Sequence, residues 1–361
     1  MTGTLPERAP VMADVARLAG VSLQTVSRVV NGAPQLRPST RERVEEAIRQ
    51  LGYRPNVAAR ALVTKRSGTI GLIGTKSEFW GPSTIHRTVQ GAARDAGYFV
   101  SSVELVEVTR RAVAEAVEHL RDQHVEGIVL VAANDEALEV VQAQASTGTP
   151  VVVVEGDLTR AALTAGVDQL RGALLATEHL LGLGHTRIQH VAGPQHWTEA
   201  RERLTGWRTA MHAHGLRPPT PLEGDWTVAS GYDAGTRLAR DPEVTAVFVA
   251  NDHMAIGVLH ALHEAGRSVP GDVSVVGFDD LPESEFLIPP LTTVRQDFVT
   301  VGRRAIQVLQ RAIELEAAKR LEGVDGSLSR RHDRLVRPEL VVRRSTAARR
   351  TPRPTTRKRT R

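Results

Sequence analysis

Cysteine is absent from the 361 residues of the chain, so disulfide bonds, thiolate zinc sites and cysteine nucleophiles are all excluded. The sequence also lacks any run of about 18 apolar residues, and we therefore expect no membrane-spanning helix. Its N-terminal segment has no basic start followed by an apolar core of signal-peptide length. These absences favour a cytoplasmic protein, and the length of the chain favours about two or three domains.

Charge is distributed unevenly along the chain, whose formal net charge is +5. Residues 1–67 contain 11 Lys and Arg against 5 Asp and Glu, and residues 343–361 contain 9 against none. The intervening residues 68–342 therefore carry a net charge of −10. Basic ends on an acidic body predict that nucleic acid is bound at the ends.

Two short helical patterns lie on either side of Gly20 in residues 14–31. Each pattern has apolar residues at positions i, i+3 and i+4, which form one face of a helix: Val15, Leu18 and Ala19 in the first, and Val26, Val29 and Val30 in the second. Gly20 can adopt the left-handed backbone that ends a helix, and Ser22 can cap the next helix by accepting from its free amides. The stretch therefore predicts a helix-turn-helix.

The opposite face of the second helix is polar and carries Gln24, Ser27, Arg28 and Asn31, with Leu23 at its start. Gln and Arg side chains can each make paired hydrogen bonds to base edges in a major groove. This face therefore predicts base recognition. An ordinary amphipathic helix pair with a solvated polar face is the alternative.

A third helix is predicted over Pro38–Leu51, with Gly52 ending it. Its apolar stripe consists of Val44, Ala47, Ile48 and Leu51. Residues 57–62 are a further helix former of about two turns, which is too short to be stable alone in water. We expect this segment to need a partner in order to fold.

The body of the sequence alternates between β-rich apolar runs and helical patterns. The runs form two series, 69–74, 99–105, 127–132 and 150–155, followed by 187–192, 246–250 and 273–278. Near-continuous Val and Ile runs separated by helices predict parallel sheets that are covered on both faces. Ligands of such sheets bind beyond the carboxyl ends of the strands, where polar residues follow several runs: Thr75, Glu155, Asn251 and Asp279. We therefore expect two doubly wound lobes with a ligand cleft between them.

Residues 11–67 closely resemble the DNA-binding headpiece and hinge of the lac repressor family of transcriptional regulators, through SxQTVSRVVN in the second helix and YxPN before the hinge. The resemblance extends to about residue 345 through AGP at 192–194, EGDW at 223–226, VAND at 249–252, SVVGFDD at 274–280 and IPPLTTVRQDF at 288–298. It implies an all-α helix-turn-helix headpiece joined to an α/β core of the periplasmic-binding-protein-like kind, with two doubly wound parallel-sheet lobes.

The resemblance also implies domain boundaries. The expected parts are a headpiece at 1–54, a hinge helix and linker at 55–68, a core at 69–345 for sugar binding and dimerisation, and a basic disordered tail at 346–361. Within the core, we expect an N-terminal lobe from about 69–167 and 298–325, and a C-terminal lobe from about 168–297 and 326–345. The chain is expected to cross between the lobes near Asp168 and Asp297. The sequence after residue 345 has no apolar periodicity, so it lacks the leucine heptads by which the resembled repressor forms tetramers. A dimer is therefore expected.

Site residues carry over from the family position by position. The resemblance implies DNA contacts by Ser22, Leu23, Gln24, Thr25, Ser27, Arg28, Asn31, Asn56, Ala59 and Leu62, of which Leu62 would wedge into the minor groove. It implies effector contacts by Thr75, Phe79, Pro82, Ile85, Glu155, Arg203, Trp226, Asn251, Asp279, Gln296 and Phe298. Leu23 replaces a tyrosine of the resembled sequence, Thr75 a serine and Glu155 an aspartate, so both the operator and the ligand geometry are expected to differ.

Other chemistries are less well supported by the residues. GLIGTKS at 71–77 lacks the glycine spacing and the ending of a phosphate loop, and it fits a strand followed by a cleft loop. The histidines at 185, 190, 212 and 214 lack carboxylate partners at ligand spacing, so no metal is expected. Asp279 and Asp280 could act as an acid and base pair only if a pocket raised one pKa. We expect no catalytic residue and no cofactor.

The sequence therefore predicts a repressor, not an enzyme, that binds operator DNA and is released by a small sugar, with a galactoside as first candidate. A regulator of the same family that answers another sugar or a purine corepressor is the alternative, because this fold accommodates many ligands. A periplasmic solute-binding protein or an enzyme of sugar metabolism is a further alternative. The basic headpiece argues against the first of these two.

Overall fold

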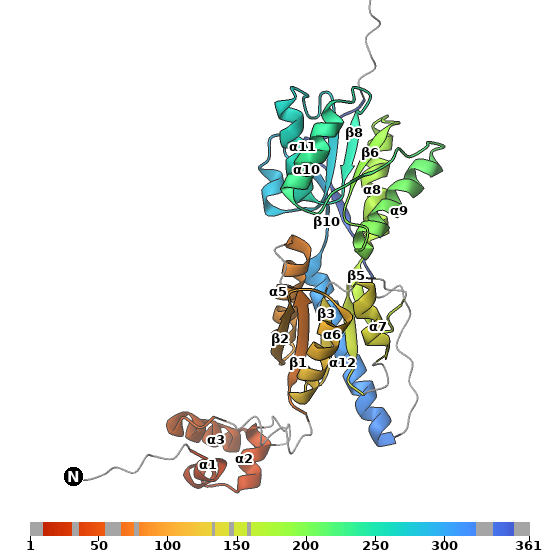
Figure 1. The fold of residues 1–361 in the computed structure, drawn as a ribbon. Helices are drawn as coiled ribbons and strands as arrows, with labels where there is room; N and C mark the ends of the chain where they lie inside the picture. The colour runs from red at the N-terminus through yellow and green to blue at the C-terminus, as the bar shows by residue number, and fades with distance from the viewer. Residues whose placement is uncertain are drawn as a thin grey trace, which may run out of the picture. The chain divides into compact units, whose positions relative to one another are not determined.

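The computed structural model describes residues 10–30, 36–54, 66–75, 79–131, 134–143, 148–156, 160–322 and 335–349. The chain divides into two compact units, Met1–Ser67 and Gly68–Arg361, which Figure 1 shows as ribbons. None of the described helices is both long and apolar enough to span a bilayer.

The first unit contains three helices, α1 (Met12–Ala19), α2 (Leu23–Val30) and α3 (Pro38–Leu51). The turn between α1 and α2 is built as predicted. Gly20 has a left-handed backbone with φ 64° and ends α1, and the Ser22 hydroxyl accepts a hydrogen bond from the Thr25 N–H at 3.2 Å. These local contacts satisfy groups that a helix end leaves free, so the helix-turn-helix follows from the sequence of the turn.

One residue of α1 that the sequence predicted to be buried is exposed in this unit. Val15, Val26 and Val44 are fully buried, but Leu18 is 50% exposed, and Ala16 is buried in its place. The prediction for Leu18 is wrong because the buried arc of α1 is centred between Val15 and Ala16. At about 100° per residue, Leu18 then lies roughly 100° from the centre of that arc.

The second unit contains two six-stranded sheets. The first sheet has the order β11-β5-β4-β3-β1-β2 and all of its pairs are parallel. Its strands are β1 (Thr69–Thr75), β2 (Phe99–Leu105), β3 (Ile128–Val131), β4 (Val151–Val154), β5 (Thr164–Val167) and β11 (Leu335–Val336). Its helices are α5 (Trp80–Asp95), α6 (Arg110–Asp122), α7 (Asp135–Ala143) and α12 (Phe298–Glu322). Helices α5 and α12 pack on one face and α6 and α7 on the other.

The second sheet has the order β12-β10-β9-β8-β6-β7, in which only β12 is antiparallel to its neighbour. Its strands are β6 (Ile188–Ala192), β7 (Leu222–Glu223), β8 (Ala246–Val249), β9 (Ser274–Asp279), β10 (Thr292–Arg295) and β12 (Glu339–Val341). Helices α8 (Gln169–Gly182) and α9 (Thr198–Ala213) cover one face, and α10 (Val228–Ala239) and α11 (Asp252–Glu264) cover the other. A short 3-10 helix, η1 (Pro282–Glu285), follows β9.

The chain passes between the two lobes three times. It leaves the first sheet after β5 and enters α8, and it returns between β10 and α12, close to the expected Asp168 and Asp297. The expected start of the last C-terminal-lobe segment at residue 326 is wrong, because β11 pairs in parallel with β5 of the first sheet. The third crossing therefore lies between β11 and β12. Two-residue strands carry too little periodicity for a sequence pattern to reveal them.

Residues 345–349 pack against the C-terminal lobe, so the prediction of disorder from residue 346 onward is wrong for residues 346–349. The Ser345 side chain is fully buried; its hydroxyl donates to the Val275 carbonyl at 2.6 Å and accepts from the Thr292 N–H at 2.8 Å. The Ala347 N–H donates to the Ser274 hydroxyl at 3.1 Å. Residues 345–349 are held by hydrogen bonds from short polar side chains and backbone groups to distant strands. Such bonds need no apolar residues, so the local sequence shows no pattern that predicts this packing.

Candidate functional site

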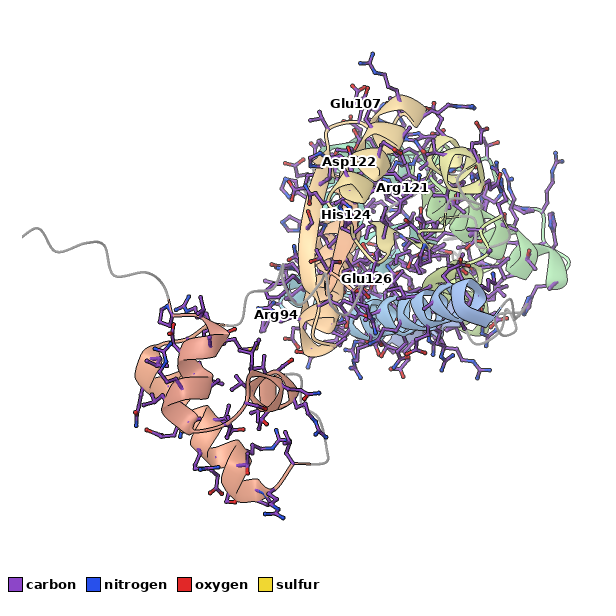
Figure 2. The ribbon with its side chains drawn as sticks, turned by 90° about the horizontal axis from the view of Figure 1, so that it is seen from below. Arg94, Glu107, Arg121, Asp122, His124 and Glu126 are labelled. Carbon is purple, nitrogen blue, oxygen red and sulfur yellow. The ribbon has the colours of Figure 1, made fainter. Side chains whose placement is uncertain are left out.

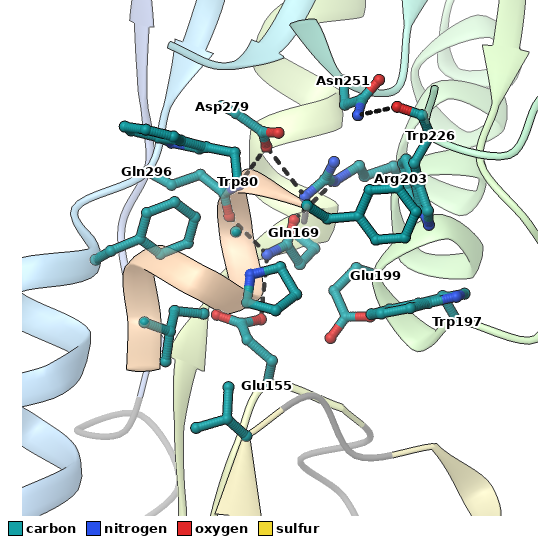
Figure 3. A pocket seen from close by; sticks show the side chains of 16 residues that line it. Trp80, Glu155, Gln169, Trp197, Glu199, Arg203, Trp226, Asn251, Asp279 and Gln296 are labelled. Carbon is teal, nitrogen blue, oxygen red and sulfur yellow. Dashed lines mark hydrogen bonds and ion pairs between the residues drawn. The ribbon is translucent and has the colours of Figure 1, made fainter. Parts of the chain in front are cut away.

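A pocket lies between the two lobes, at the carboxyl ends of both sheets (Figure 3). It contains about 570 Å³ of empty space, part of which is open to solvent. Its polar side chains come from the carboxyl ends of strands or the residues that follow them, namely Glu155, Asn251, Asp279 and Gln296, and from the helices α8 and α9, namely Gln169, Glu199 and Arg203. Its lining residues are Phe79, Trp80, Gly81, Pro82, Ile85, Val131, Glu155, Gln169, Trp197, Glu199, Arg203, Trp226, Asn251, Asp279, Gln296 and Phe298.

The structure brings together most of the residues expected to contact an effector. All of them line the pocket except Thr75, at the end of β1. The Thr75 hydroxyl is buried and has no hydrogen-bond partner among the residues that the structure describes. The grouping is a finding of the structure, whereas a role in effector binding stays a prediction for each residue.

Strained backbone positions hold several of these side chains in the pocket. Glu155, Trp226 and Asp279 have φ angles of 63°, 77° and 109°, a region in which side chains other than glycine cost about 1 to 3 kcal/mol each. Gly193 permits the Trp226 position, since a Cβ atom added there would lie 2.2 Å from the indole ring. Strain of this kind is typical of functional sites.

Gln169, at the start of α8, is the centre of a hydrogen-bond network that joins the lobes. Its amide nitrogen donates to Glu155 Oε2 at 3.2 Å and to Gln296 Oε1 at 2.8 Å. Its amide oxygen accepts from Arg203 Nε at 2.9 Å. Gln296 donates in turn to Asp279 Oδ1 at 2.6 Å, and an Arg203 amine nitrogen lies 3.6 Å from the same oxygen. Gln169, Arg203, Asp279 and Gln296 therefore form a closed ring, and Glu155 connects this ring to the N-terminal lobe (Figure 3).

Burial raises the pKa of the two carboxyl groups in this network. The pKa of Glu155 rises to about 8, first through burial and then through the nearby Glu199 carboxylate, although the Val167 N–H and Gln169 favour the charged form. The pKa of Asp279 rises to about 6 through burial, which Arg203 and Gln296 partly offset. Near neutral pH, Glu155 is therefore largely protonated and can donate a hydrogen bond as well as accept one.

Aromatic rings form the walls beside these polar groups. The ring of Trp197 lies edge-on to that of Phe79, with centroids 6.3 Å apart, and edge-on to that of Trp226 at the same centroid distance. The Arg203 guanidinium lies 3.9 Å from the centroid of Phe278, which holds it in place. Apolar ring faces next to carboxylate, amide and guanidinium groups suit a ligand with one apolar and one hydroxylated side, such as a sugar.

Asn251 has a structural role that accounts for both of its polar atoms. Its side-chain oxygen caps α11 by accepting from the Met254 N–H at 2.9 Å, and its amide donates to the Trp226 carbonyl at 3.1 Å. Asn251 therefore fixes the Trp226 backbone whether or not it touches a ligand.

Sequence reasoning missed part of the lining, namely Trp80, Gly81, Val131, Gln169, Trp197 and Glu199. Gln169 directly follows the expected crossing at Asp168, so its place at the lobe junction could have been noticed. Trp197 and Glu199 follow the strand β6 and its AGP motif by a few residues. Their side chains are brought into the pocket by the turn before α9, which the sequence pattern does not specify.

The DNA-contact residues expected on the helix-turn-helix lie on or beside α2. Ser22, Leu23, Gln24 and Arg28 are exposed, with Leu23 53% exposed, and Thr25 and Ser27 are half-buried. Asn31, Asn56, Ala59 and Leu62 lie outside the described residues, as does the hinge segment 57–62. The exposed side of α2 therefore carries the polar side chains of Gln24 and Arg28, and base reading by them stays a prediction.

The histidines that the structure describes do not gather into a metal site. Within the described residues, no group of three or more His, Asp or Glu side chains is placed to hold a metal ion. His190 instead stacks on the rings of Phe248 and Trp207, at centroid distances of 4.7 and 5.2 Å. Burial lowers its pKa to about 3, so it packs in the C-terminal lobe as a neutral ring.

Comparison with known proteins gives matches along most of the chain. Residues 11–56 match the family described as bacterial regulatory proteins, lacI family, and residues 177–346 match the periplasmic binding protein-like domain. The lactose operon repressor of Escherichia coli (strain K12) is 37% identical over 309 residues, which cover 85% of this chain and 85% of that protein. The HTH-type transcriptional regulator CelR of Thermobifida fusca is 38% identical over 322 residues, which cover 84% of this chain and 91% of that protein.

A solved structure of the lac repressor dimer bound to operator and the anti-inducer ONPF is similar to this chain over most of its length. Its TM-score is 0.78 at 34% identity, and the match covers 94% of this chain and 100% of that chain. These matches confirm the resemblance inferred from the sequence and the predicted fold class. Both curated relatives are transcription regulators by name.

Proposed function

Because the chain belongs to the lacI family of bacterial regulatory proteins, we propose that it is a transcriptional repressor that binds operator DNA as a homodimer and is released by a small sugar. A galactoside is the first candidate effector. Function on operator DNA places the protein in the cytoplasm, and we assign it no enzymatic activity. Incubation of the pure protein with candidate glycosides tests the last point, since turnover would overturn it.

The observation that carries this proposal is the polar network between the lobes. Gln169 contacts Glu155 of the N-terminal lobe and Arg203 of the C-terminal lobe. A ligand that exchanges hydrogen bonds with this network would prefer one angle between the lobes over another. Only such a difference in affinity can shift the population of two states.

A thermal-shift screen of sugars tests the ligand class. A sugar at about 100 times its dissociation constant should add about 2.7 kcal/mol to the free energy of unfolding. Stabilisation by a sugar that also lowers operator affinity supports the proposal, whereas a stabilising purine that raises operator affinity would identify a corepressor. A sugar other than a galactoside is the second candidate, because Glu155 is one methylene longer than the aspartate of the resembled sequence.

Arg28→Ala should weaken binding to the operator by about 1 to 3 kcal/mol and binding to random DNA by little, since it removes a pair of hydrogen bonds to a base edge. Arg28 is on the exposed side of α2. Operator and random duplexes of equal length are titrated in parallel by fluorescence anisotropy. Arg49→Ala is the matched control, because Arg49 lies on α3 and pairs with Glu46. Equal losses on both duplexes would mean that Arg28 contacts phosphate only.

Leu62→Ala should weaken operator binding by about tenfold and reduce DNA bending. The resemblance implies that this side chain opens a base step, which costs a few kcal/mol and is repaid by contacts that the bend permits. Operator affinity and bending are measured by anisotropy and by circular permutation of the binding site. Leu62→Met keeps the side-chain volume and should retain both properties. Unchanged bending in the alanine variant would disprove the wedge.

A further inference from the structure

Carboxyl groups outnumber cations among the described residues that line the pocket. Glu155, Glu199 and Asp279 all line it, whereas Arg203 is the one basic residue of this described lining. The Arg203 guanidinium lies 3.6 Å from Asp279 Oδ1 and donates to the Gln169 amide oxygen at 2.9 Å. Arg203 therefore balances the charge of Asp279, and the carboxyl groups of Glu155 and Glu199 are left without an ion-pair partner among the described residues.

Glu155 and Glu199 come from different lobes, and their charges act on each other. Glu155 directly follows β4, and Glu199 lies in the first turn of α9. Glu155 Oε1 accepts from the Val167 N–H at 3.0 Å, and Glu199 Oε1 accepts from the Gly156 N–H at 3.0 Å. Burial and then the charge of Glu199 raise the pKa of Glu155, whereas the opposing effect of Arg203 on this pKa is weaker. Negative charge therefore prevails at this end of the pocket.

The arginine closest in sequence to Glu199 does not supply the missing positive charge. Arg201 donates to the Gln195 carbonyl and to the Thr198 hydroxyl, each at 3.0 Å. Its guanidinium also lies 3.7 Å from the Asp135 carboxylate of the other lobe. Arg201 is therefore turned to partners outside the pocket.

Aromatic rings stand beside the carboxyl pair. Trp197 precedes Glu199 by two residues, and its ring is roughly perpendicular to those of Phe79 and Trp226, at 82° and 86°. Ring faces attract cations through their quadrupole, and an ammonium group gains most from them where water is excluded. Rings combined with carboxyl groups in this way suit a protonated amine.

Asp279 supplies a separate indication that a polar ligand completes the pocket. Its side chain is only 8% exposed, and its contacts with Gln296 and Arg203 both go through Oδ1. Among the described residues, Oδ2 has no hydrogen-bond partner, although buried polar atoms are normally bonded. A ligand hydroxyl can donate to this oxygen.

The carboxyl surplus is particular to the pocket end of the N-terminal lobe. Figure 2 looks onto the amino end of the first sheet, where Arg94 and Arg121 lie among Asp122 and Glu126, so neither sign of charge prevails there. Figure 3 shows the side chains of Glu155 and Glu199 at the carboxyl end, where Arg203 is the one labelled basic residue. The surplus is therefore not a general property of the acidic body.

From the carboxyl pair, the rings and the free Asp279 oxygen, we propose that the effector is a sugar with a protonated amino group, which binds between Glu155 and Glu199 while a hydroxyl binds Asp279. This inference rests on the proposed release by a sugar and names the chemical class of that sugar. An ammonium group donates three hydrogen bonds and accepts none, which matches a site rich in acceptors. A sugar phosphate is disfavoured, because it would add charge of the same sign.

Binding of an amine has a consequence that binding of a neutral sugar lacks. At about pH 6.5 Glu155 holds a proton in the empty pocket, because its pKa is about 8. An ammonium group next to a carboxyl group favours the charged form of the carboxyl. The proton of Glu155 therefore passes to the buffer when the amine binds. Arg203 and Asp279, the other ionisable groups of the described lining, stay paired with each other.

Isothermal titration of the full-length protein with matched sugars tests the proposal. Galactosamine is compared with galactose, and glucosamine with glucose, at about pH 6.5 in two buffers with different heats of ionisation. At least one amine should bind about tenfold or more tightly than its hydroxyl counterpart, since close charge pairs are strongly coupled. The difference in heat between the two buffers should correspond to release of about one proton for each bound amine.

Two variants assign the effect to the carboxyl pair. Glu199→Gln keeps an acceptor for the Gly156 N–H and should reduce the preference for the amine to less than about threefold. Glu155→Gln should abolish proton release, because it removes the group that loses the proton. Glu178→Gln is the matched control on α8, where Glu178 is 45% exposed and pairs with Arg171, and it should keep both the preference and the proton release.

Several results would overturn the proposal. These are binding of the neutral sugars as tightly as the amines, no binding of either amine, amine binding without proton release, or an unchanged preference in Glu199→Gln. Tighter binding of choline than of both amino sugars would assign the pocket to an amine that is not a sugar. Failure of the repressor proposal would be seen separately, as a sugar that binds in the titration and leaves operator affinity unchanged.

Discussion

Arg203→Ala is expected to bind operator normally and to stay bound when the effector is added. Among the described residues that line the pocket, Arg203 is the only one with a positive charge, and it contacts Gln169, the Ala250 carbonyl and Asp279. Truncating one member of a buried charge pair typically costs 2 to 5 kcal/mol of binding. The effector concentration needed for half release should therefore rise at least about 30-fold.

The measurement is operator binding across an effector titration, for wild type and variant side by side. Arg208→Ala serves as the matched control because Arg208 is exposed on the same helix. Removing Arg203 leaves Asp279 buried without its cationic partner, which can itself destabilise the fold. Adding Asp279→Asn to the variant removes that charge and should restore stability without restoring release. Normal release by Arg203→Ala would exclude the residue from the ligand site, and loss of operator binding without effector would show a structural role.

Glu155→Gln is expected to flatten the dependence of stability on pH. The pKa of Glu155 is about 8 in the folded protein against an ordinary value of 4.5. A carboxyl group whose pKa is higher in the folded than in the unfolded protein favours the folded state while it is protonated. This contribution to stability is complete below the pKa of the unfolded state, and it is lost as pH rises through the pKa of the folded state. Each pKa unit corresponds to about 1.4 kcal/mol, so the wild type should lose several kcal/mol of stability between about pH 4.5 and 8.

Two other buried carboxyl groups act in the same direction. The pKa of Asp252 rises to about 7 through burial and the nearby Asp279, against hydrogen bonds from Ser284, Thr293 and Leu281. The pKa of Asp279 rises to about 6. The Glu155→Gln variant should therefore keep a pH dependence of stability below about pH 7 and lose most of it between about pH 7 and 8.

Thermal unfolding of the full chain between pH 5 and 9 measures this effect. Each kcal/mol should shift the melting temperature of a domain of this size by about 2 to 4 °C. The slope with pH is the quantity compared, because glutamine also changes the hydrogen bonds to Val167 and Gln169 by an amount that does not depend on pH. Glu223→Gln is the control at a solvent-exposed carboxyl group. A variant slope equal to that of the wild type would show that Glu155 is charged throughout this range.

Much of the fold follows from signals that act within a few residues. The turn at Gly20 and Ser22 and the bounds of α3 were predicted correctly, because a left-handed glycine, a capping hydroxyl and a proline start each decide a helix end locally. The long strands were also predicted, since buried parallel strands need continuous Val and Ile. The strands β5, β7, β10, β11 and β12 and the anchored segment 345–349 were not predicted, because their hydrogen-bond partners lie elsewhere in the chain.

By itself, the sequence determined the helix-turn-helix, the two wound lobes and the family, because these rest on local periodicity and contiguous motifs. Only the tertiary structure decided that Gln169 joins Glu155, Arg203 and Gln296 in one network, across as many as 127 positions of sequence. It likewise decided that Glu199 lies close enough to raise the pKa of Glu155. Hydrogen bonds and charge interactions depend on distances of a few ångströms between side chains. The three chain crossings between the lobes set those distances, and no periodic pattern in the sequence encodes them.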